Sequence, residues 1–444
     1  MNSTRLYIES LGCARNQVDS ETMAGQLQLA GWSMVQDPSQ ADVIVVNTCS
    51  FVASAIDESI DTILELAQHK KTGRCRRLVV AGCLPERFRD AIVDALPEVD
   101  QFLGTGAFTR ITDAVAGKMP RGSCLLPDPD SIPMDPKTAR QRAQTHTAYL
   151  KIAEGCSRHC TYCIIPQLRG RQKSRPVEQI LEEARELVAN GVRELNLVAQ
   201  DTTAYGQDLD VGVGLDVLLN RLAEEVGNTW IRFLYGHPES ITDRVIEAVA
   251  DHDNLCPYFD LPVQHAAANV LKKMNRHYDR EQLLDLFGRI RAAVSDAAIR
   301  TTLIVGFPGE TETDFQTLMD FVEQVRFDHL GVFIYSDAED LPSHRLPDHV
   351  PSEVTQMRYD ALMEKQMQIS SDNLTAMVGQ TMPVLVENQI EPHLFEGRST
   401  RQAPEVDGLT FVRTGLDGPN VLVGQPTLVR ITDALEYDFI GDAI

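Results

Sequence analysis

Three cysteines stand close together near the middle of the chain, in the arrangement Cys-x-x-x-Cys-x-x-Cys. They are Cys156, Cys160 and Cys163, and they follow a stretch that is expected to be a β-strand. Thiolates hold iron–sulfur clusters, and an ordinary 4Fe–4S cluster takes four of them. Because this run supplies three, the fourth iron would stay open to bind another molecule. The alternatives are a loop without a metal and a zinc site with His159 as fourth ligand, but the tight spacing makes chelation by His159 awkward, so we favour the cluster.

A second set of cysteines is spread over the first hundred residues. Cys13, Cys49 and Cys83 each end a strand-like apolar run, next to Gly or Thr. In an open α/β sheet the carboxyl ends of the strands gather on one edge, where ligands bind, so we expect a second cluster there. The alternative is that each is a small buried apolar side chain. We assign that alternative to the remaining cysteines, which are Cys75, Cys124 and Cys256.

The hydrophobic pattern predicts the elements that would position both sets. Over residues 4–119, strand-like runs alternate with stretches of helical periodicity, which indicates a doubly wound α/β domain with a parallel sheet. Residues 120–146 are rich in Pro, Asp and Ser, which indicates a linker.

The rest of the chain has two further patterns. Residues 147–372 contain six strand-like runs that alternate with helical ones, which fits a partial (βα)6 barrel rather than the full eight-fold one. Residues 374–444 show short β-like runs separated by Gly, Asp and Pro turns, a pattern typical of a small OB-like β-barrel. The predicted fold class is therefore α/β, with a small β-barrel after the central domain.

Composition and charge narrow the class of protein. Of the 444 residues, 43% are hydrophobic and 24% are charged, which is typical of a folded globular chain. There is neither a run of about 18 apolar residues nor a signal peptide, so we expect no membrane span and a cytoplasmic location. In that reducing compartment the nine cysteines favour cluster ligation over disulfides. The net charge of −23 disfavours nucleic acid and favours a basic partner.

The central cysteine run, with Tyr162 just before its last cysteine, resembles the signature of the radical S-adenosylmethionine (SAM) superfamily. That resemblance implies that the open iron binds the amino and carboxylate groups of SAM. An electron from the cluster then cleaves SAM to a 5′-deoxyadenosyl radical. The partial barrel is the core fold of that superfamily, and an external electron donor such as a flavodoxin or ferredoxin is implied.

Further motifs narrow the resemblance to the methylthiotransferase family, with an N-terminal cluster domain, a radical SAM core and a C-terminal TRAM domain. In chain order these motifs are LGCARNQVDSE, NTCSF, AEGCSRHCTYCIIPQLRGRQKSR, LVAQDTTAYGQD, LPVQHAAANVLKKM and LIVGFPGET. Gln200-Asp201 and Gln264-His265-Ala266 resemble the type that modifies the β-carbon of an aspartate in small-subunit ribosomal protein uS12. The sister type, which modifies an adenosine of transfer RNA, tends to have Gln-Asn and Gln-Ser-Gly there.

The family resemblance implies a bifunctional enzyme with two 4Fe–4S clusters. The central cluster would generate a radical that removes hydrogen from an unactivated carbon, and the second would present a methylated sulfur to that carbon. SAM would be consumed as methyl donor and as radical source, so the cofactors carry the chemistry. The alternatives are the transfer-RNA enzyme and, from another class, a non-catalytic iron–sulfur electron carrier, which needs neither an open iron nor a TRAM-like domain. We expect a monomer.

Polar residues and glycines at predicted strand ends are candidates for binding SAM. The turn after residue 305 resembles the segment that lines the adenine and ribose of SAM, with a tight structural turn as the alternative. In barrels, side chains at the carboxyl ends of strands are often functional, with a satisfied polar strand end as the alternative. We expect packing or surface roles for His237 and His277. The candidates are Gln200, Asp201, His265, Gly306, Gly309 and Glu310.

Local charge gives two further indications. Between Cys156 and Pro176 there are five basic residues and no acid, and such a stretch is either a solvated loop or a site for a carboxylate. From Ala376 to Ile444, four bases stand against ten acids, so this part would repel RNA and attract a basic polypeptide, unless the acidity only aids solubility. The five basic residues are Arg158, Arg169, Arg171, Lys173 and Arg175.

One motif departs from the family. Members commonly continue a Tyr-Ser pair with x-Glu-x-Gly-Thr, whereas here Tyr335-Ser336 is followed by Asp337-Ala338-Glu339-Asp340-Leu341. The contacts of that loop therefore cannot be inferred from the resemblance.

Overall fold

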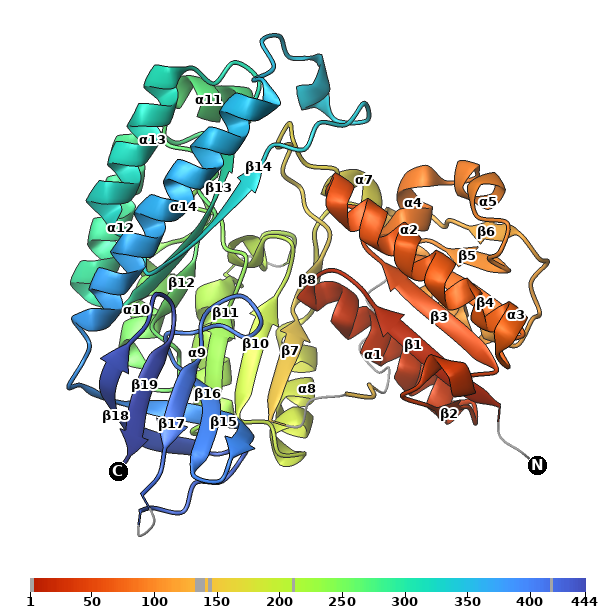
Figure 1. Ribbon diagram of the computed structural model, residues 1–444, viewed down its shortest axis with the longest axis horizontal. Coiled ribbons are helices and arrows are strands. Elements are labelled where there is room, and N and C mark those ends of the chain that lie inside the picture. Colours follow the sequence, from red (N-terminus) through yellow and green to blue (C-terminus); the bar gives the residue numbers. More distant parts are fainter. Residues whose placement is uncertain (1–3, 132–139, 143–145, 210–211, 416–417) are drawn as a thin grey trace.

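The computed structural model describes residues 4–131, 140–142, 146–209, 212–415 and 418–444. In chain order it contains a parallel sheet domain, a partial barrel and a small closed β-barrel (Figure 1). The predicted fold class is thereby confirmed. Among the described residues, no helix is long and apolar enough to cross a membrane.

The N-terminal sheet has six parallel strands in the order β2-β1-β3-β4-β5-β6. Helices on both faces cover it, so β3 and β4 are almost entirely buried, as central parallel strands are. The main helices are α1 (Ala14–Leu29) and α2 (Ala53–Ala67). The strands are β1 (Arg5–Ser10), β2 (Ser33–Met34), β3 (Val43–Thr48), β4 (Arg77–Gly82), β5 (Gln101–Leu103) and β6 (Ser123–Leu125).

The stretch expected to be a linker contains part of this sheet. Its residues 123–125 form β6, which pairs with β5, so regular structure extends further than the sequence pattern indicated. The expected linker also includes residues 132–139 and 143–145, which lie outside the described residues.

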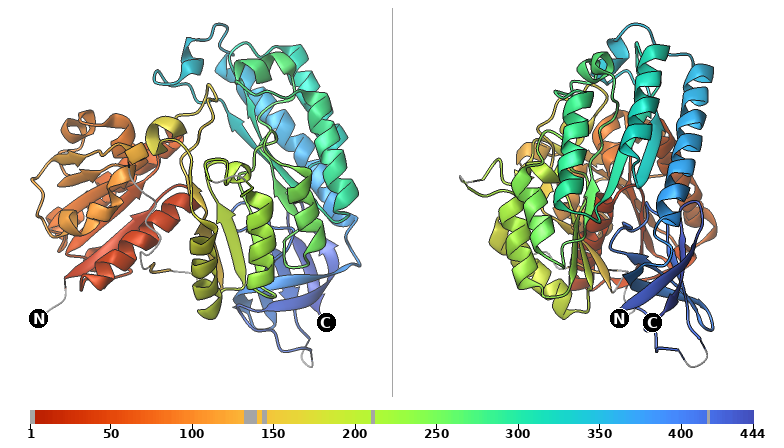
Figure 2. Two further views of the ribbon diagram at one scale, coloured as in Figure 1. Left: turned by 180° about the vertical axis from the view of Figure 1, so that it is seen from behind. Right: turned by 90° about the vertical axis from the view of Figure 1, so that its left-hand side faces the viewer.

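The partial barrel consists of two three-stranded parallel sheets, β11-β10-β7 and β12-β13-β14. The helices lie on the outer side of these strands (Figure 2). Alternate strand residues such as Leu195 and Leu197 belong to one large apolar core together with residues of the surrounding helices. The strands are β7 (Thr147–Lys151), β10 (Glu194–Val198), β11 (Trp230–Phe233), β12 (Tyr258–Asp260), β13 (Ala298–Val305) and β14 (His329–Ile334). The covering helices are α8 (Val177–Ala189), α9 (Leu215–Glu225), α10 (Asp243–Asp251), α12 (Arg280–Ala293), α13 (Glu312–Val325) and α14 (Ser352–Thr375).

The C-terminal domain is a closed barrel with the strand order β15-β16-β17-β19-β18. It packs against the amino ends of the partial-barrel strands (Figure 1). Arg398 is 1% exposed and lies 2.5 Å from Glu194, which also accepts a hydrogen bond from Arg232 at 3.1 Å. The strands are β15 (Thr381–Glu391), β16 (Leu394–Ser399), β17 (Thr410–Arg413), β18 (Pro426–Ala434) and β19 (Phe439–Ala443).

One apolar cluster contains residues from all three domains. It joins Ala14 and Val18 of α1 to Tyr149 and Tyr258 of the partial barrel and to Leu385 of the C-terminal barrel. The three domains therefore share buried surface and are not independent modules on flexible tethers.

Candidate active site

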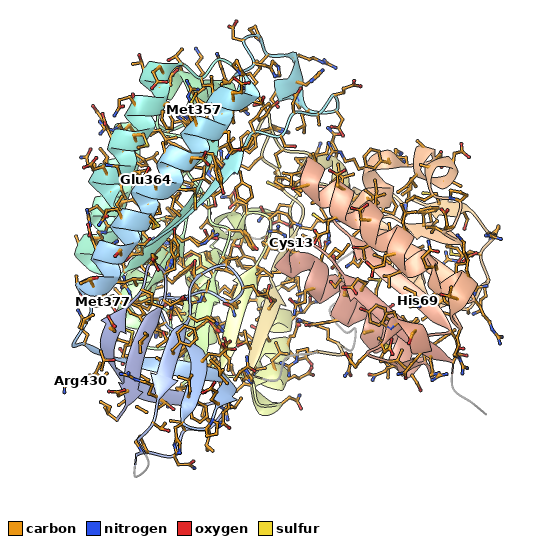
Figure 3. All side chains as sticks on the ribbon, viewed as in Figure 1. Cys13, His69, Met357, Glu364, Met377 and Arg430 are labelled. Carbon is orange, nitrogen blue, oxygen red and sulfur yellow. The ribbon has the colours of Figure 1, made fainter. Side chains whose placement is uncertain are left out.

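Cys13, Cys49 and Cys83, here called the N-terminal triad, lie at the carboxyl edge of the first sheet. They follow the adjacent strands β1, β3 and β4. Cys13 lies at the start of α1, on the side that faces the partial barrel (Figure 3). Gly12 has a φ of +92°, and a Cβ there would come within 2.7 Å of the Cβ of Cys49. The glycine therefore permits two of the triad loops to approach each other closely.

Two guanidinium groups lie beside the N-terminal triad. Burial opposes ionisation of Cys13, but the charges of Arg15 and Arg169 outweigh it and lower the pKa of that thiol. Burial raises the pKa of Cys83 to about 12, although Arg169 Nη2 donates to its Sγ at 3.7 Å. Metal ligation requires thiolates, so two cations beside the triad favour the deprotonated, ligating form.

Cys156, Cys160 and Cys163, the core triad, share the loop between β8 (Ala153–Glu154) and α7 (Ile165–Arg169). Gly155 begins this loop with a φ of +81°, and a Cβ there would lie 2.1 Å from the backbone oxygen of Arg171. Only glycine fits that backbone position without displacement. Burial raises the pKa of Cys156 to about 11 and that of Cys163 to about 12.

The donor sets fit iron–sulfur clusters better than a single metal ion. Across the described residues, no three Cys, His, Asp or Glu side chains stand close enough together to hold one ion. A 4Fe–4S cluster takes one thiolate per iron, so its thiolates stand farther apart than the ligands of a single ion. None of the six thiols forms a disulfide. The core triad places its three sulfur ligands in one loop, and the N-terminal triad places its three at one edge of the sheet.

A buried ion-pair network joins the two triads. Arg169, six residues beyond Cys163, donates to Asp19 at 2.7 Å and to Asn16 at 2.5 Å, both on α1. Lys151 in turn binds Asp19 at 2.6 Å and Glu154 at 2.8 Å. Two cations surround Glu154, and although burial opposes it they lower the pKa of that carboxyl. The network holds the core loop against the helix that begins at Cys13.

Two of the sequence candidates at strand ends face the core triad. Asp201 accepts a hydrogen bond from Arg158 at 2.9 Å, and Arg158 stands two residues after Cys156. Gln200 donates to Glu154 at 2.7 Å, and its Oε1 is buried without a partner among the described residues. Both side chains therefore belong to the wall beside the core loop.

The remaining candidates form a compact group under α14. Glu310 accepts from the backbone N–H groups of Gly306 and Phe307 at 2.5 and 3.1 Å and lies 3.2 Å from Arg358. The carboxylate of Glu310 thus stabilises the turn that contains it, by accepting hydrogen bonds from the backbone of that turn. His265 is fully buried, with Nε2 4.0 Å from Glu310 Oε1.

The two glycines of this turn both have positive φ. A Cβ on Gly306 would meet Thr355 at 2.3 Å, and one on Gly309 would meet Lys273 Nζ at 1.8 Å. Close packing against Thr355 is thus a reason for glycine at position 306, whereas at position 309 the reason is the positive φ, because the flexible end of Lys273 could move aside.

The basic stretch of the core loop is mostly engaged inside the protein. Arg158 binds Asp201 and Glu239, and Arg169 belongs to the network described above. Arg175 donates to Glu183 at 2.6 Å. These three side chains are therefore not free to take up a ligand carboxylate without giving up a present partner.

Arg276 was not among the residues predicted from the sequence. Its side chain is 8% exposed and donates to the Tyr162 hydroxyl at 2.6 Å, while its Nη1 is buried without a partner among the described residues. It therefore offers an unused buried N–H beside the core triad. Nothing in the local pattern distinguishes this arginine from a surface one, because its contact to Tyr162 spans 114 positions.

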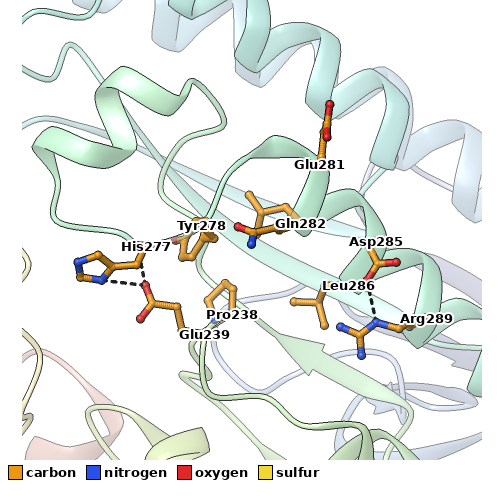
Figure 4. Close-up of a pocket in the computed structure, with 10 residues that line it drawn as sticks. Pro238, Glu239, His277, Tyr278, Glu281, Gln282, Asp285, Leu286 and Arg289 are labelled. Atoms are coloured by element: carbon orange, nitrogen blue, oxygen red, sulfur yellow. Dashed lines mark hydrogen bonds and ion pairs between the residues drawn. The ribbon is translucent and has the colours of Figure 1, made fainter.

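A surface pocket of about 560 Å³ opens outside the barrel, between residues 238–239 and α12 (Figure 4). Arg158 pairs with Glu239 at 2.6 Å and Arg289 pairs with Asp285 at 2.9 Å, so two of the carboxylates that line it are already engaged. We assign this pocket no part in the chemistry.

Comparison with known proteins matches all three parts of the chain. Family models described as uncharacterized protein family UPF0004, radical SAM superfamily and TRAM domain match residues 5–104, 150–322 and 378–444. Among solved structures, the radical S-adenosylmethionine methyltransferase TsrM from Kitasatospora setae aligns with a TM-score of 0.60. The alignment covers 83% of this chain and 89% of that one at 12% sequence identity, which supports the fold alone.

Curated relatives match over the whole length. The ribosomal protein uS12 methylthiotransferase RimO of Desulfosudis oleivorans is 52% identical over 99% of this chain and 100% of its own length. The proteins of the same name from Geobacter sulfurreducens and Clostridioides difficile are 46% and 45% identical, each over 99% of this chain and over 98% and 99% of their own lengths. Fold and core motif define a radical SAM enzyme. The chain belongs to the ribosomal protein uS12 methylthiotransferase family.

Proposed function

We propose that this protein is a SAM-dependent methylthiotransferase that modifies the β-carbon of an aspartate in ribosomal protein uS12. The observation that carries the proposal is the pair of cysteine triads, which a buried network of Arg169, Asp19, Lys151 and Glu154 holds together. An electron carrier has no use for clusters that three cysteines leave with an open iron, nor for a TRAM domain. Membership in the methylthiotransferase family supports the same reaction.

Each of the two cysteine-containing domains would hold one cluster. Residues 147–372 would hold one 4Fe–4S cluster on the core triad, and residues 4–119 would hold the other on the N-terminal triad. When bound, the two clusters and SAM supply the radical, the sulfur and the methyl group. Residues 120–146 would connect these domains, and residues 374–444 form the TRAM domain.

The chain's own groups would orient SAM at the core triad. The buried Nη1 of Arg276 is suited to a carboxylate, because a guanidinium N–H without a partner gains most from an anionic acceptor. Gln200, Asp201 and His265 would line the same site, while Gly306, Gly309 and Glu310 would shape it through the turn that they form. A flavodoxin or ferredoxin would deliver electrons.

Charge on the C-terminal barrel supports a protein substrate over RNA. Of its four arginines, Arg398 is buried against Glu194, Arg401 pairs with Asp328, and Arg413 pairs with Asp442. Arg430 makes no ion pair within the described residues. Since binding to RNA depends on phosphate neutralisation, a barrel with so few available cations favours a basic protein, as ribosomal proteins are. We infer a monomer that works in the cytoplasm.

The test offers both substrates to the reconstituted enzyme in one anaerobic reaction. A methylthio mass shift is expected on the aspartate-bearing peptide of ribosomal protein uS12, with none on transfer-RNA adenosine. Modification of the RNA alone would overturn the proposal and assign the chain to the sister activity.

A further inference from the structure

The strand β14 (His329–Ile334) leaves one edge of the partial barrel open. It pairs with β13 from Arg300–His329 to Val305–Ile334, and no other described strand pairs with its outer edge. Helix α1 contacts β7, the strand at the opposite edge of the partial barrel. Exposed edges invite pairing with another chain, and proteins usually protect them with Lys, Pro, a bulge or a covering helix. The sequence of β14, HLGVFI, contains none of these residues and its ladder runs without a bulge. Helix α14 packs against β14, yet Phe333 and Ile334 at the carboxyl end of the strand remain exposed.

Large apolar side chains stand on this edge. Phe333 is 53% exposed and Ile334 is 42% exposed. Since neighbouring side chains of a strand point to opposite faces, both faces of the strand are exposed at this end. Phe51, which is 41% exposed, precedes α2 in the N-terminal domain. Helix α2 begins beside β14, because the backbone N–H of Ala53 donates to Ser336 Oγ at 3.2 Å.

The carboxyl end of β14 leads to both triads. Tyr335, the next residue, packs edge-to-face on Phe307 at 5.2 Å, and Phe307 packs on Tyr162 at 6.3 Å, within the core triad loop. Further along the same loop, Leu341 is buried in one cluster with Cys83 of the N-terminal triad. A chain lying along β14 would therefore reach the region where the two triads face each other.

The surroundings of β14 are acidic. Helix α2 contains no Lys or Arg, and its four carboxylates are exposed and make no ion pair within the described residues. Glu339 is exposed in the loop after β14, where Asp340 pairs with Arg87 at 2.7 Å and Arg345 is an exposed base. The α2 carboxylates are Asp57, Glu58, Asp61 and Glu65. This excess of negative charge attracts a basic chain and repels nucleic acid.

We propose that the free edge of β14 is the docking strand for the substrate, and that an extended segment of a basic polypeptide pairs with it by backbone hydrogen bonds. The added strand places the target residue between the two triads, with Phe333 and Ile334 against its side chains. This inference rests on the ribosomal protein substrate proposed above, and it assigns to that substrate a binding mode and a strand.

Alternation along a parallel strand identifies the backbone groups that would bind. The N–H of Tyr335 donates to Val305 at 2.9 Å, so the N–H groups of Ile334 and Val332 point away from β13. Proline is tolerated on an edge strand where the lost N–H faces solvent, so Ile334→Pro removes one docking donor and leaves the barrel ladder complete. Ile334→Ala shortens the same side chain but keeps the N–H, which makes it the matched control.

The first measurement is steady-state methylthiolation of purified ribosomal protein uS12. Ile334→Pro is expected to raise KM by about tenfold and Ile334→Ala by less than about threefold, since a tenfold change corresponds to about 1.4 kcal/mol, close to one hydrogen bond. Met357 is an exposed apolar residue away from this edge, on α14 (Figure 3). The KM of Met357→Ala is expected to equal that of the parent enzyme. Equal KM values for the Pro and Ala variants would overturn the docking strand.

The second measurement needs no variant and so does not depend on Ile334→Pro folding. Amide hydrogen exchange at Val332 and Ile334 of the parent enzyme is expected to slow when uS12 is added. Unchanged exchange while uS12 is being modified would overturn the inference and leave the proposed function standing. If amide exchange at these residues slowed when the enzyme concentration rose without uS12, a second copy of the enzyme would occupy this edge, and the inference would be overturned as well. If the parent modifies only transfer RNA, the proposed function itself fails.

Discussion

Removal of the Arg169 guanidinium tests whether the buried network couples the two triads. Arg169 is 3% exposed and its neighbours Asp19 and Glu154 lie 2.7 and 3.2 Å away. In Arg169→Met both carboxylates keep Lys151 but lose their second cation. Two buried carboxylates then share one cation, which leaves one negative charge in excess, and removal of one partner of a buried ion pair costs about 3–5 kcal/mol.

The assay is denaturant unfolding of the metal-free protein together with iron content after reconstitution. Arg169→Met is expected to lower the free energy of unfolding by that amount and to lose iron from the N-terminal triad, since Arg169 also contacts Cys83. The matched control is Arg185→Met, whose exposed pair with Glu225 has a similar length of 2.6 Å. It should leave the free energy of unfolding almost unchanged, because solvent and salt screen an exposed ion pair.

A double-mutant cycle separates the pair from side effects of each change. Arg169→Met combined with Asp19→Asn is expected to be less harmful than the sum of the single changes, with a coupling of about 1–3 kcal/mol. If Arg169→Met were as mild as Arg185→Met, or if its effect added fully to that of Asp19→Asn, the network would not be what holds the triads together.

Three further outcomes are expected. Replacing the three cysteines of either triad by Ala should halve the iron content from about eight to about four per chain, and a single cluster lost in both variants would contradict the two-site arrangement. Reduced enzyme without the N-terminal triad should still release 5′-deoxyadenosine from SAM; loss of cleavage with the core cluster intact would refute the division of labour. Stability should also fall in acid through Glu194, because Arg398 and Arg232 outweigh burial and lower its pKa to about 2. Because the folded pKa is lowered, this stabilisation is present above the unfolded pKa of about 4 and is lost progressively as the pH falls to about 2, by roughly 3 kcal/mol in all. Glu194→Gln should flatten that dependence in unfolding measured against pH.

The fold was predictable where one pattern repeats along a strand or helix. Strands β3 and β4 read as continuous apolar runs because both faces of a parallel sheet are covered, and this placed Cys49 and Cys83 at one edge. Strand β6 was missed because its three residues are only half-buried and carry no pattern. A run that short is indistinguishable from a loop until its partner β5 is known.

The candidate site was predictable in its cysteines and less so in its polar residues. Glu310 matched a ligand-lining motif, yet a sequence cannot tell a carboxylate that faces a ligand from one that accepts N–H groups of its own turn. Arg169 was included only as one of five bases, since its contacts to α1 span about 150 positions. Such roles depend on which domain packs on which loop, and local spacing does not contain that information.

The C-terminal barrel also has a consequence for how this enzyme tolerates truncation. A domain that only recruits the substrate and sits on a flexible linker can be deleted without loss of catalysis. This domain instead closes the partial barrel at the amino ends of its strands. Deletion of residues 374–444 would remove Arg398 from Glu194 and Asp407 from the Tyr258 hydroxyl, which it accepts at 2.6 Å. The inner strand residues would then meet bulk water from the end opposite the core triad. A shortened enzyme should therefore lose protection of its radical chemistry from solvent as well as affinity for its substrate.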